Sequence, residues 1–346
     1  MPRRTRFQRI RQSRSFLLIL LTILILVILA IVKKGFVDFN AGNLTIITME
    51  LSYYGLFVTA MACLLMSGGF DFSLASQATL GTLVFVQLCV DHQDTHWLLF
   101  AVVVLLIGVA MGALNAFLSQ VLNLMPFICT IAMSTVWIGI ANWWTGGLVK
   151  TVNNESLISV ATSRVFGSPV PWTFIFMIAV FIIYSLMFKY TRFGRSVLIV
   201  GGNPVAARLA GLNPKRVKAL LYVNASFLGM LAGLVYTAQQ RTANVTGLPQ
   251  RMPEMRGLTS SMLGGVSFMG GSGALTGAFF GILLTQVLAN TMTTMGLPAW
   301  IVQFTNGMLL VIALTIDSLS TRIRLKRLGL KASGGGGGMM MPGMSR

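Results

Sequence analysis

Charged residues are scarce in this chain. They make up 10% of its 346 residues, whereas hydrophobic residues make up 55%. A soluble domain carries about a quarter charged residues, so this composition excludes a soluble protein. With only 8 acidic residues, the chain also offers no carboxylate pair on one face, no HExxH sequence and no Ser/His pairing of the kind used in catalysis. The composition predicts an all-α polytopic membrane protein that is not an enzyme.

Cysteine and histidine are almost as rare, which argues against disulfides and metal sites. The three cysteines, Cys63, Cys89 and Cys129, all lie inside apolar runs, where a cysteine acts as a small packing residue. The two histidines, His92 and His96, lie in the polar link DHQDTH. Its Asp and His side chains could hold a metal ion, but we prefer a solvated turn. We expect no metal site and no cofactor bound by this chain.

A nucleotide-binding loop is also missing. In the sequence GxxxxGK[ST], backbone amides and a lysine hold the phosphates, and this sequence does not occur here. The glycine-rich stretches lie between apolar runs and lack a following Lys-Ser or Lys-Thr. The chain therefore has no means of hydrolysing ATP, and the energy for any transport must come from elsewhere.

Long apolar runs are what the chain has in abundance. Residues 16–32 carry no charge and, at about 1.5 Å per residue with short flanks, can just cross a hydrocarbon core of roughly 30 Å. Lys33 and Lys34 follow this run where a signal peptide would have a small-residue cleavage site, so we expect a retained first span. About ten transmembrane helices are predicted, some short or interrupted by glycine, at residues 16–32, 46–66, 73–90, 97–122, 126–145, 170–188, 217–238, 255–270, 273–290 and 300–317.

Basic residues gather in three places beside the span ends. Six arginines lie in the first fourteen residues, seven Lys and Arg lie in 189–218, and a further group lies in 322–331, within a net charge of +18. Such clusters mark the cytoplasmic side of a membrane protein. Ten crossings place all three clusters on one side, so both termini are predicted to be cytoplasmic. This placement favours contact with membrane lipid and argues against a nucleic-acid partner.

The same pattern divides the chain into three parts. Residues 1–15 form a basic cytoplasmic tail, and residues 16–320 form the transmembrane domain. Residues 321–346 are first basic and then rich in Gly and Met, and we predict that this cytoplasmic tail is disordered.

Glycine pairs interrupt the apolar pattern at two places that resemble each other. GGFDF and ATLG in 68–81 keep the same spacing as GGVSF and ALTG in 264–277, which suggests an internal repeat of the kind found in transporters. Irregular backbone at membrane depth is tolerated where it is buried in protein or lines a wet cavity. The alternative interpretation is close helix packing through small residues.

The first glycine pair belongs to a span-junction motif, Gly68, Gly69, Asp71 and Ser73. Asp71 could be a proton or cation site, because a carboxylate between two spans is costly. We prefer that Asp71 and Ser73 cap the amino end of the following span at the cytoplasmic boundary. Two other acidic residues, Glu50 and Asp317, are predicted to lie at the membrane interfaces.

The stretch from Lys189 to Lys218 is a basic island between two apolar spans. Gly201-Gly202-Asn203-Pro204 predicts a turn that leads into a short helix at 205–212, and Asn213-Pro214 starts the next segment. A short helix of small residues with basic neighbours is suited to docking against a soluble partner. An interfacial helix lying on anionic lipid is the alternative.

Four segments resemble a known family in the same order along the chain. They are MSGGFDFSLAS (66–76), NLMPFICTIAM (123–133), the island at 191–218 and LGGVSFMGGSGALTGAFFG (263–281). Over roughly 45–320 the chain resembles permease subunits of bacterial ABC importers of the ribose/galactose/xylose type, in the branched-chain-amino-acid and monosaccharide permease superfamily. It departs from the family at Leu74-Ala75, where Val-Gly is usual, and at Ile138, where many members have Arg.

The resemblance implies a bacterial inner-membrane complex. Two permeases, identical or different, would bind a cytoplasmic ABC ATPase subunit that hydrolyses the ATP, and a periplasmic binding protein would deliver a sugar or related polar solute. By the same resemblance, 189–218 is the ATPase-coupling loop, with contacts at Gly194, Gly202, Asn203, Ala206, Ala207, Gly211 and Leu212.

Polar and aromatic residues of the fourth and fifth spans are the candidates for the translocation pathway, because amides and ring faces suit sugars. They are Asn115, Asn123, Phe127, Thr130, Trp137 and Asn142. Trp143 and Trp144 are better explained as interface anchors. The alternative function is an ion-coupled secondary transporter that uses Asp71.

Overall fold

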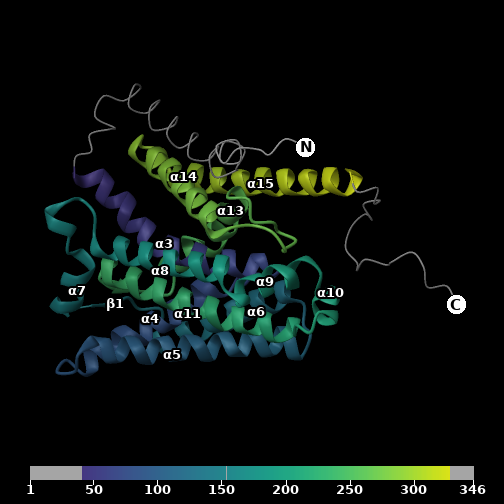
Figure 1. Ribbon diagram of the computed structural model, residues 1–346. Coiled ribbons are helices and arrows are strands. Elements are labelled where there is room, and N and C mark those ends of the chain that lie inside the picture. Colours follow the sequence, from purple (N-terminus) through teal and green to yellow (C-terminus); the bar gives the residue numbers. More distant parts are fainter. Residues whose placement is uncertain (1–40, 153, 328–346) are drawn as a thin grey trace.

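The computed structural model describes residues 41–152 and 154–327 (Figure 1). The predicted basic tail 1–15, the first predicted span 16–32 and most of the predicted tail 321–346 lie outside these residues. Within them the chain is almost entirely helical. The helices are α3 (Ala41–Met66), α4 (Leu74–Asp91), α5 (Trp97–Ala116), α6 (Pro126–Thr145), α7 (Glu155–Thr162), α8 (Trp172–Tyr190), α9 (Arg192–Gly202), α10 (Pro204–Leu209), α11 (Pro214–Gln240), α12 (Gly247–Gln250), α13 (Pro253–Leu263), α14 (Leu275–Thr294) and α15 (Ala299–Arg327).

Short irregular helices and one small sheet complete the described part. A π-helical turn, Phe117–Val121, extends α5, and a 3-10 turn, Val165–Gly167, lies before α8. Strand β1 (Lys150–Thr151) pairs antiparallel with β2 (Thr242–Ala243), with Lys150 opposite Ala243. This pairing ties the link after α6 to the link after α11.

Eight of the predicted spans are confirmed as helices that are long and apolar enough to cross a membrane. They are α3, α4, α5 with its π-helical extension, α6, α8, α11, α14 and α15. The predicted span 255–270 is wrong in its length, because the 11-residue α13 reaches only about 16 Å. Gly265, with a φ of 89°, turns the chain just after α13 ends, and the left-handed region that it occupies favours glycine.

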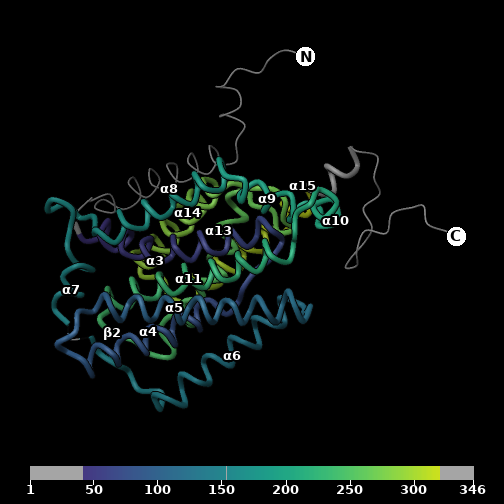
Figure 2. Tube along the Cα trace, turned by 60° about the horizontal axis from the view of Figure 1, so that its bottom comes forward, coloured from purple at the N-terminus to yellow at the C-terminus, as the bar shows by residue number. Residues whose placement is uncertain are grey.

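Helix α3 forms the centre of the bundle, and its residues from Leu51 to Met66 are nearly all buried. Helices α8, α11, α13 and α14 pack around it, α4 packs against α5, α6 and α11, and α6 lies apart on one side (Figure 2). The outer helices expose large apolar side chains such as Leu106 on α5 and Ile183 on α8. Because lipid tails solvate such side chains, this surface fits a membrane protein.

The short helices lie at the two ends of the bundle. In Figure 1, α9, α10 and the carboxyl end of α15 lie at one end, and α7 and β1 lie at the other end. The basic island of 189–218 therefore lies at the same end as the last turns of α15. This arrangement agrees with the shared side that the basic clusters predict.

Candidate functional site

Asp71 lies in a buried hydrogen-bond network between α3 and α4. Its Oδ1 accepts hydrogen bonds from the Ser73 amide at 2.8 Å and the Ser73 hydroxyl at 2.5 Å. Its Oδ2 accepts from Asn115 Nδ2 at 3.0 Å, and this amide also donates to Ser73 Oγ at 2.8 Å. Gln77 Nε2 donates to the same hydroxyl. The carboxylate is fully buried, so these donors compensate for the water that it has lost.

The prediction that Asp71 and Ser73 cap the following helix is correct in where that helix begins, but the predicted capping hydrogen bonds do not form. Helix α4 begins after Ser73, yet the Ser73 side chain accepts no bond from the amides of its first turn. Asp71 instead bonds to the Ser73 amide, two residues on, in an Asx turn. The carboxylate therefore stabilises the loop before the helix from inside the protein.

Two predicted pathway residues form hydrogen bonds to this junction. Asn115 of α5 donates to Asp71, and Thr130 of α6 accepts a hydrogen bond from the Phe72 amide at 3.2 Å. Both side chains are fully buried. From a third direction, the Tyr222 hydroxyl of α11 donates to the Phe70 carbonyl at 3.2 Å. Residues 70–73 are thus bound by three helices that are distant in the sequence.

The other predicted pathway residues are spread along the two spans. Asn123, with a φ of 55°, donates to the Val121 carbonyl in the link before α6. Phe127 packs against the Phe72 ring with centroids 5.5 Å apart. Trp137 has a buried indole nitrogen without a hydrogen-bond partner, and the exposed Asn142 bonds back to Ile138. The structure does not bring these residues together into one site.

The second glycine junction lies directly beside the first. The Gly271 amide donates to the Met66 carbonyl at 2.9 Å, and the two loops touch at Gly68 and Gly270. Both helices end in the same way, because the Gly69 amide bonds to Leu64 and the Val266 amide bonds to Ser261 across the turn. This is the Schellman pattern, with a left-handed residue before the bonded amide.

The shared turn does not by itself establish the predicted repeat, because Gly211 and Gly296 form the same turn after α10 and α14, and the two junctions match in a different register from the one that the spacing suggests. The left-handed glycines are Gly68 at φ 72° and Gly265 at φ 89°, so Gly68 matches Gly265 and not Gly264. Helix α4 then begins at Leu74 and α14 at Leu275, which makes the second loop longer. Equal spacing in the sequence does not correspond to equal geometry here.

Asp317 ties α15 to this second loop. Its Oδ2 accepts hydrogen bonds from the Ser267 hydroxyl at 3.2 Å and the Phe268 amide at 3.1 Å. The carboxylate is buried in protein, close to the end of the apolar part of α15 at Leu319. The loop needs an acceptor for its free amide, and α15 supplies one.

The basic island forms two short helices with capped ends. Thr191 caps α9, and the Asn203 side chain accepts from the amides of Val205 and Ala206, both at 3.0 Å, at the start of α10. Helix α10 ends at Leu209, earlier than predicted, and Gly211 follows with a φ of 80°. The Asn213 side chain then caps α11. Asparagine directly before α10 and before α11 is a strong signal in the sequence for a helix start, because its side-chain oxygen accepts hydrogen bonds from the free amides of the first turn.

The predicted coupling residues differ in exposure. Ala207 is fully buried, and a Cβ at the buried Gly194 would lie 2.1 Å from the Phe188 carbonyl oxygen, so these two residues shape the island from beneath. The surface is formed instead by Gly202, Asn203, Ala206 and Gly211, with Leu212 partly exposed. The most exposed apolar side chain on α10 is Leu209, at 88%, which the sequence analysis missed because leucine is common in helices of every kind.

Gly201 joins the island to both glycine junctions. An added Cβ there would lie 2.1 Å from the Met66 carbonyl oxygen and 2.6 Å from the Gly271 amide nitrogen. No side chain can enter this contact without moving backbone. Any displacement of α9 therefore acts directly on the ends of α3 and of the 264–274 loop.

We expect Gly201→Ala to destabilise the purified protein by about 1–3 kcal/mol, because the methyl group must break the Gly271–Met66 hydrogen bond. The neighbouring Gly202→Ala is the matched control. Its Cβ would meet nothing closer than 3.7 Å, so its effect should stay within about 0.5 kcal/mol. Thermal unfolding in detergent measures both, and equal melting temperatures for the two variants would contradict the close contact.

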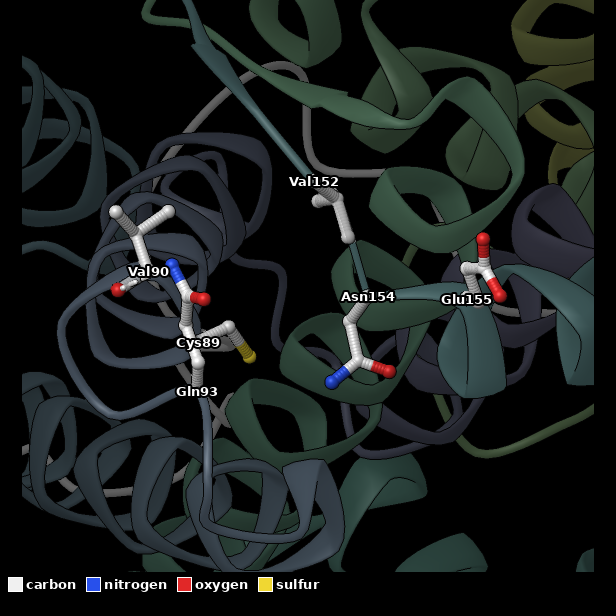
Figure 3. A pocket seen from close by; sticks show the side chains of 6 residues that line it. All are labelled: Cys89, Val90, Gln93, Val152, Asn154 and Glu155. Atoms are coloured by element: carbon white, nitrogen blue, oxygen red, sulfur yellow. Dashed lines mark hydrogen bonds between the residues drawn. The ribbon is translucent and has the colours of Figure 1, made fainter.

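Two cavities lie at opposite ends of the bundle. One, of about 440 Å³, lies where α10 turns into α11 and is lined by Arg208, Gly211, Leu212, Asn213, Pro214 and Lys215. The other, of about 390 Å³, is shown in Figure 3, where Cys89 and Gln93 lie across from Asn154. The Asn154 side chain already caps α7 by accepting from the Leu157 amide. The first cavity is therefore the better candidate for a partner, since it adjoins the exposed Leu209.

The DHQDTH link is a capped turn. The His96 side chain accepts a hydrogen bond from the Leu98 amide at the start of α5. Within residues 41–152 and 154–327, no three His, Cys, Asp or Glu side chains come close enough to share a metal ion. The three cysteines are buried.

Comparisons with known proteins agree with these features. The chain is 28% identical to the fructose import permease protein FruF of Bifidobacterium longum, over 83% of this chain and 82% of the relative. It is 26% identical to the ribose import permease protein RbsC of Haemophilus influenzae (89% and 93% covered). It is 28% identical to the L-arabinose transport system permease protein AraH of Escherichia coli (80% and 82% covered). No solved structure gives a significant match.

The family model described as the permease component of branched-chain amino acid transport systems matches residues 43–314. This range runs from the third residue of α3 into the apolar part of α15, and it includes both glycine junctions and the basic island. The chain belongs to this family of transport-system permease components.

Proposed function

We propose that this chain is the transmembrane permease subunit of an ATP-binding-cassette importer for a sugar or a related polar solute, located in the bacterial inner membrane. The observation that carries this proposal is the family match over residues 43–314, together with relatives named as fructose, ribose and arabinose permeases. The chain has no phosphate-binding loop, so a separate ATPase subunit supplies the energy.

The partners follow from the same proposal. A cytoplasmic ABC ATPase docks on the island at 189–218, where Leu209 and the neighbouring cavity face outward. A second permease, identical or different, completes the membrane unit, and a periplasmic binding protein delivers the solute to the opposite end. ATP is bound and hydrolysed by the ATPase alone.

No observation favours an ion-coupled carrier. Both carboxylate oxygens of Asp71 are occupied by hydrogen bonds from Ser73 and Asn115. A coupling site would have to release and rebind an ion at this fully buried position, and doing so would break the loop that starts α4.

The test is transport by the assembled complex. The tagged chain is purified with its ATPase and reconstituted in vesicles that contain ATP, and binding protein with radiolabelled ribose, arabinose or fructose is added outside. We expect uptake of at least one sugar that needs both ATP and binding protein and that persists when a protonophore collapses the ion gradient. Uptake without ATP that the protonophore abolishes would overturn the proposal.

A further inference from the structure

A group of polar side chains lies inside the bundle where α3, α13 and α14 meet. Arg251 Nη1 donates to Glu50 Oε1 and to the Tyr53 hydroxyl, both at 3.2 Å. Gln286 of α14 donates to the other oxygen of Glu50. Residues 50 and 251 are distant in the sequence, so this ion pair exists only because α13 packs against α3.

The second arginine, Arg256, lacks such a partner. Its guanidinium lies over the Tyr54 ring, 4.4 Å from the centroid, and donates to Gln286 Oε1 at 3.2 Å. Among the described residues the one ion pair within 4.0 Å is Arg251–Glu50, so Arg256 has no carboxylate within that distance. A guanidinium cation inside a helix bundle costs free energy unless a carboxylate, water or a ligand compensates its charge.

Three further polar atoms also lack a compensating partner. The hydroxyl of Tyr54, Oε2 of Glu254 and Oδ1 of Asn290 are buried, and none of these atoms has a hydrogen-bond partner. Asn290 lies on α14 one turn after Gln286, and Glu254 lies in the first turn of α13. Unsatisfied buried polar groups are rare in native proteins and require a reason.

Glu50 and Gln286 lie well inside their helices, more than two turns from the nearest helix end. Glu50 is nine residues from the start of α3, or about 13 Å, and Gln286 is eight residues from the end of α14, or about 12 Å. At this depth the side chains of Arg251 and Glu50 are still 37% and 29% exposed. Charges facing lipid at this depth would cost several kcal/mol, so the exposed side must meet water, a ligand or another protein chain.

The backbone beside the group leads to the same inference. Between α11 and α13 the chain forms only the two-residue β2 and the four-residue α12, joined by turns, and Met252 adopts a left-handed φ of 44°. Irregular backbone at membrane depth occurs where it is buried in protein or lines a water-filled cavity, and Met252 is 51% exposed. An irregular and partly exposed segment of this kind is what lines a water-filled cavity in a membrane protein.

We propose that Glu50, Arg251, Glu254, Arg256, Gln286 and Asn290, here named the polar cluster, line the solute pathway and hydrogen-bond a neutral polyhydroxylated solute as it passes. The cluster combines two arginines with two carboxylates, so its formal charge sums to zero and favours neither an anion nor a cation. Amide, guanidinium and carboxylate groups match hydroxyls as donors and acceptors, and the Tyr54 face can pack against a sugar ring.

This inference rests on the proposed function but places the pathway away from the predicted residues of α5 and α6. Its first test is water access. Met255, between Glu254 and Arg256, is 38% exposed, and Leu106 on α5 is 63% exposed. The native cysteines are buried, so the labelling of a single introduced cysteine can be measured in the otherwise natural chain. We expect Met255→Cys to react with a membrane-impermeant thiol reagent and Leu106→Cys to stay unlabelled.

The second test is transport by the assembled complex. Arg256→Gln removes the charge, and the expected result is an uptake rate lower by about tenfold or more, because a charge-assisted hydrogen bond to the solute is lost. ATP hydrolysis stimulated by the loaded binding protein should persist, and Arg256→Lys should recover part of the uptake. Arg164→Gln, at an exposed position in the link before α8, is the matched control and should transport normally.

The outcomes separate this inference from the proposed function. If the natural complex imports sugar while Met255→Cys is inert to the reagent and Arg256→Gln transports at the natural rate, the polar cluster is not in the pathway. If Arg256→Gln loses ATPase stimulation and thermal stability together with uptake, its role is structural and the inference fails. If the natural complex shows no ATP-dependent uptake, the proposed function fails first.

Discussion

Leu209→Asp is expected to abolish ATP-driven uptake while the protein remains inserted and folded. Leu209 projects from α10 with 88% of its surface exposed, in a basic link between two spans and beside the cavity at the start of α11. A large apolar side chain exposed to water marks an interaction site, and anchors of this kind cost about 2 kcal/mol or more when removed. The ATPase should therefore bind at least about 30-fold more weakly.

Leu209→Met is the control for this prediction, since it keeps an apolar side chain of similar volume and should retain uptake. Association is measured by titrating the purified ATPase onto the detergent-solubilised permease, and stability by thermal unfolding of the permease alone. Because Leu209 makes almost no contact within the chain, both variants should unfold like the natural protein. Undiminished ATPase affinity for Leu209→Asp would show that α10 is not the docking helix.

Asp71→Asn is expected to lower the free energy of unfolding by about 1–3 kcal/mol, the cost of leaving a buried polar group without a partner. The new Nδ2 must face a donor, either Asn115 Nδ2 or the Ser73 amide, because the two carboxylate oxygens accept from these groups. Reduced uptake by Asp71→Asn would therefore report a damaged loop and would not by itself indicate ion coupling.

Exchanging the two side chains separates these explanations. In Asp71→Asn with Asn115→Asp, the amide of residue 71 can again donate to a carboxylate at residue 115. We expect the double variant to regain at least half of the lost unfolding free energy in chemical denaturation, since the two positions are in contact and their effects are not additive. A double variant no more stable than the sum of the two single changes would contradict the hydrogen-bonded role of Asp71.

Local patterns were enough to predict the helices and their order. Apolar runs long enough to cross a bilayer predicted eight helices of the described part, and the Asn-Pro pairs at 203–204 and 213–214 predicted where α10 and α11 begin. The island was recognised as a distinct cytoplasmic feature because charge and helix breakers stand out between apolar runs. These signals are local, since each depends on residues within one or two turns.

The sites could be predicted less well. Asn115 and Thr130 were candidates for the pathway because polar residues within spans suggest contact with a solute, yet both are hydrogen-bonded to the junction around Asp71. Ala207 and Gly194 were predicted to contact an ATPase subunit, yet both are buried beneath the surface of the island. A polar residue in a membrane helix needs a partner, and its sequence position alone does not tell whether that partner is protein, water or solute.

Composition and short-range pattern were thus sufficient to predict a polytopic helical membrane protein, because hydrophobic length and helix caps are properties of neighbouring residues. Only the tertiary packing decided that α13 is too short to cross alone, that Gly201 touches Met66 and Gly271, and that Arg251 pairs with Glu50. Those contacts join residues that are far apart along the chain, and their free energy depends on which helices lie side by side.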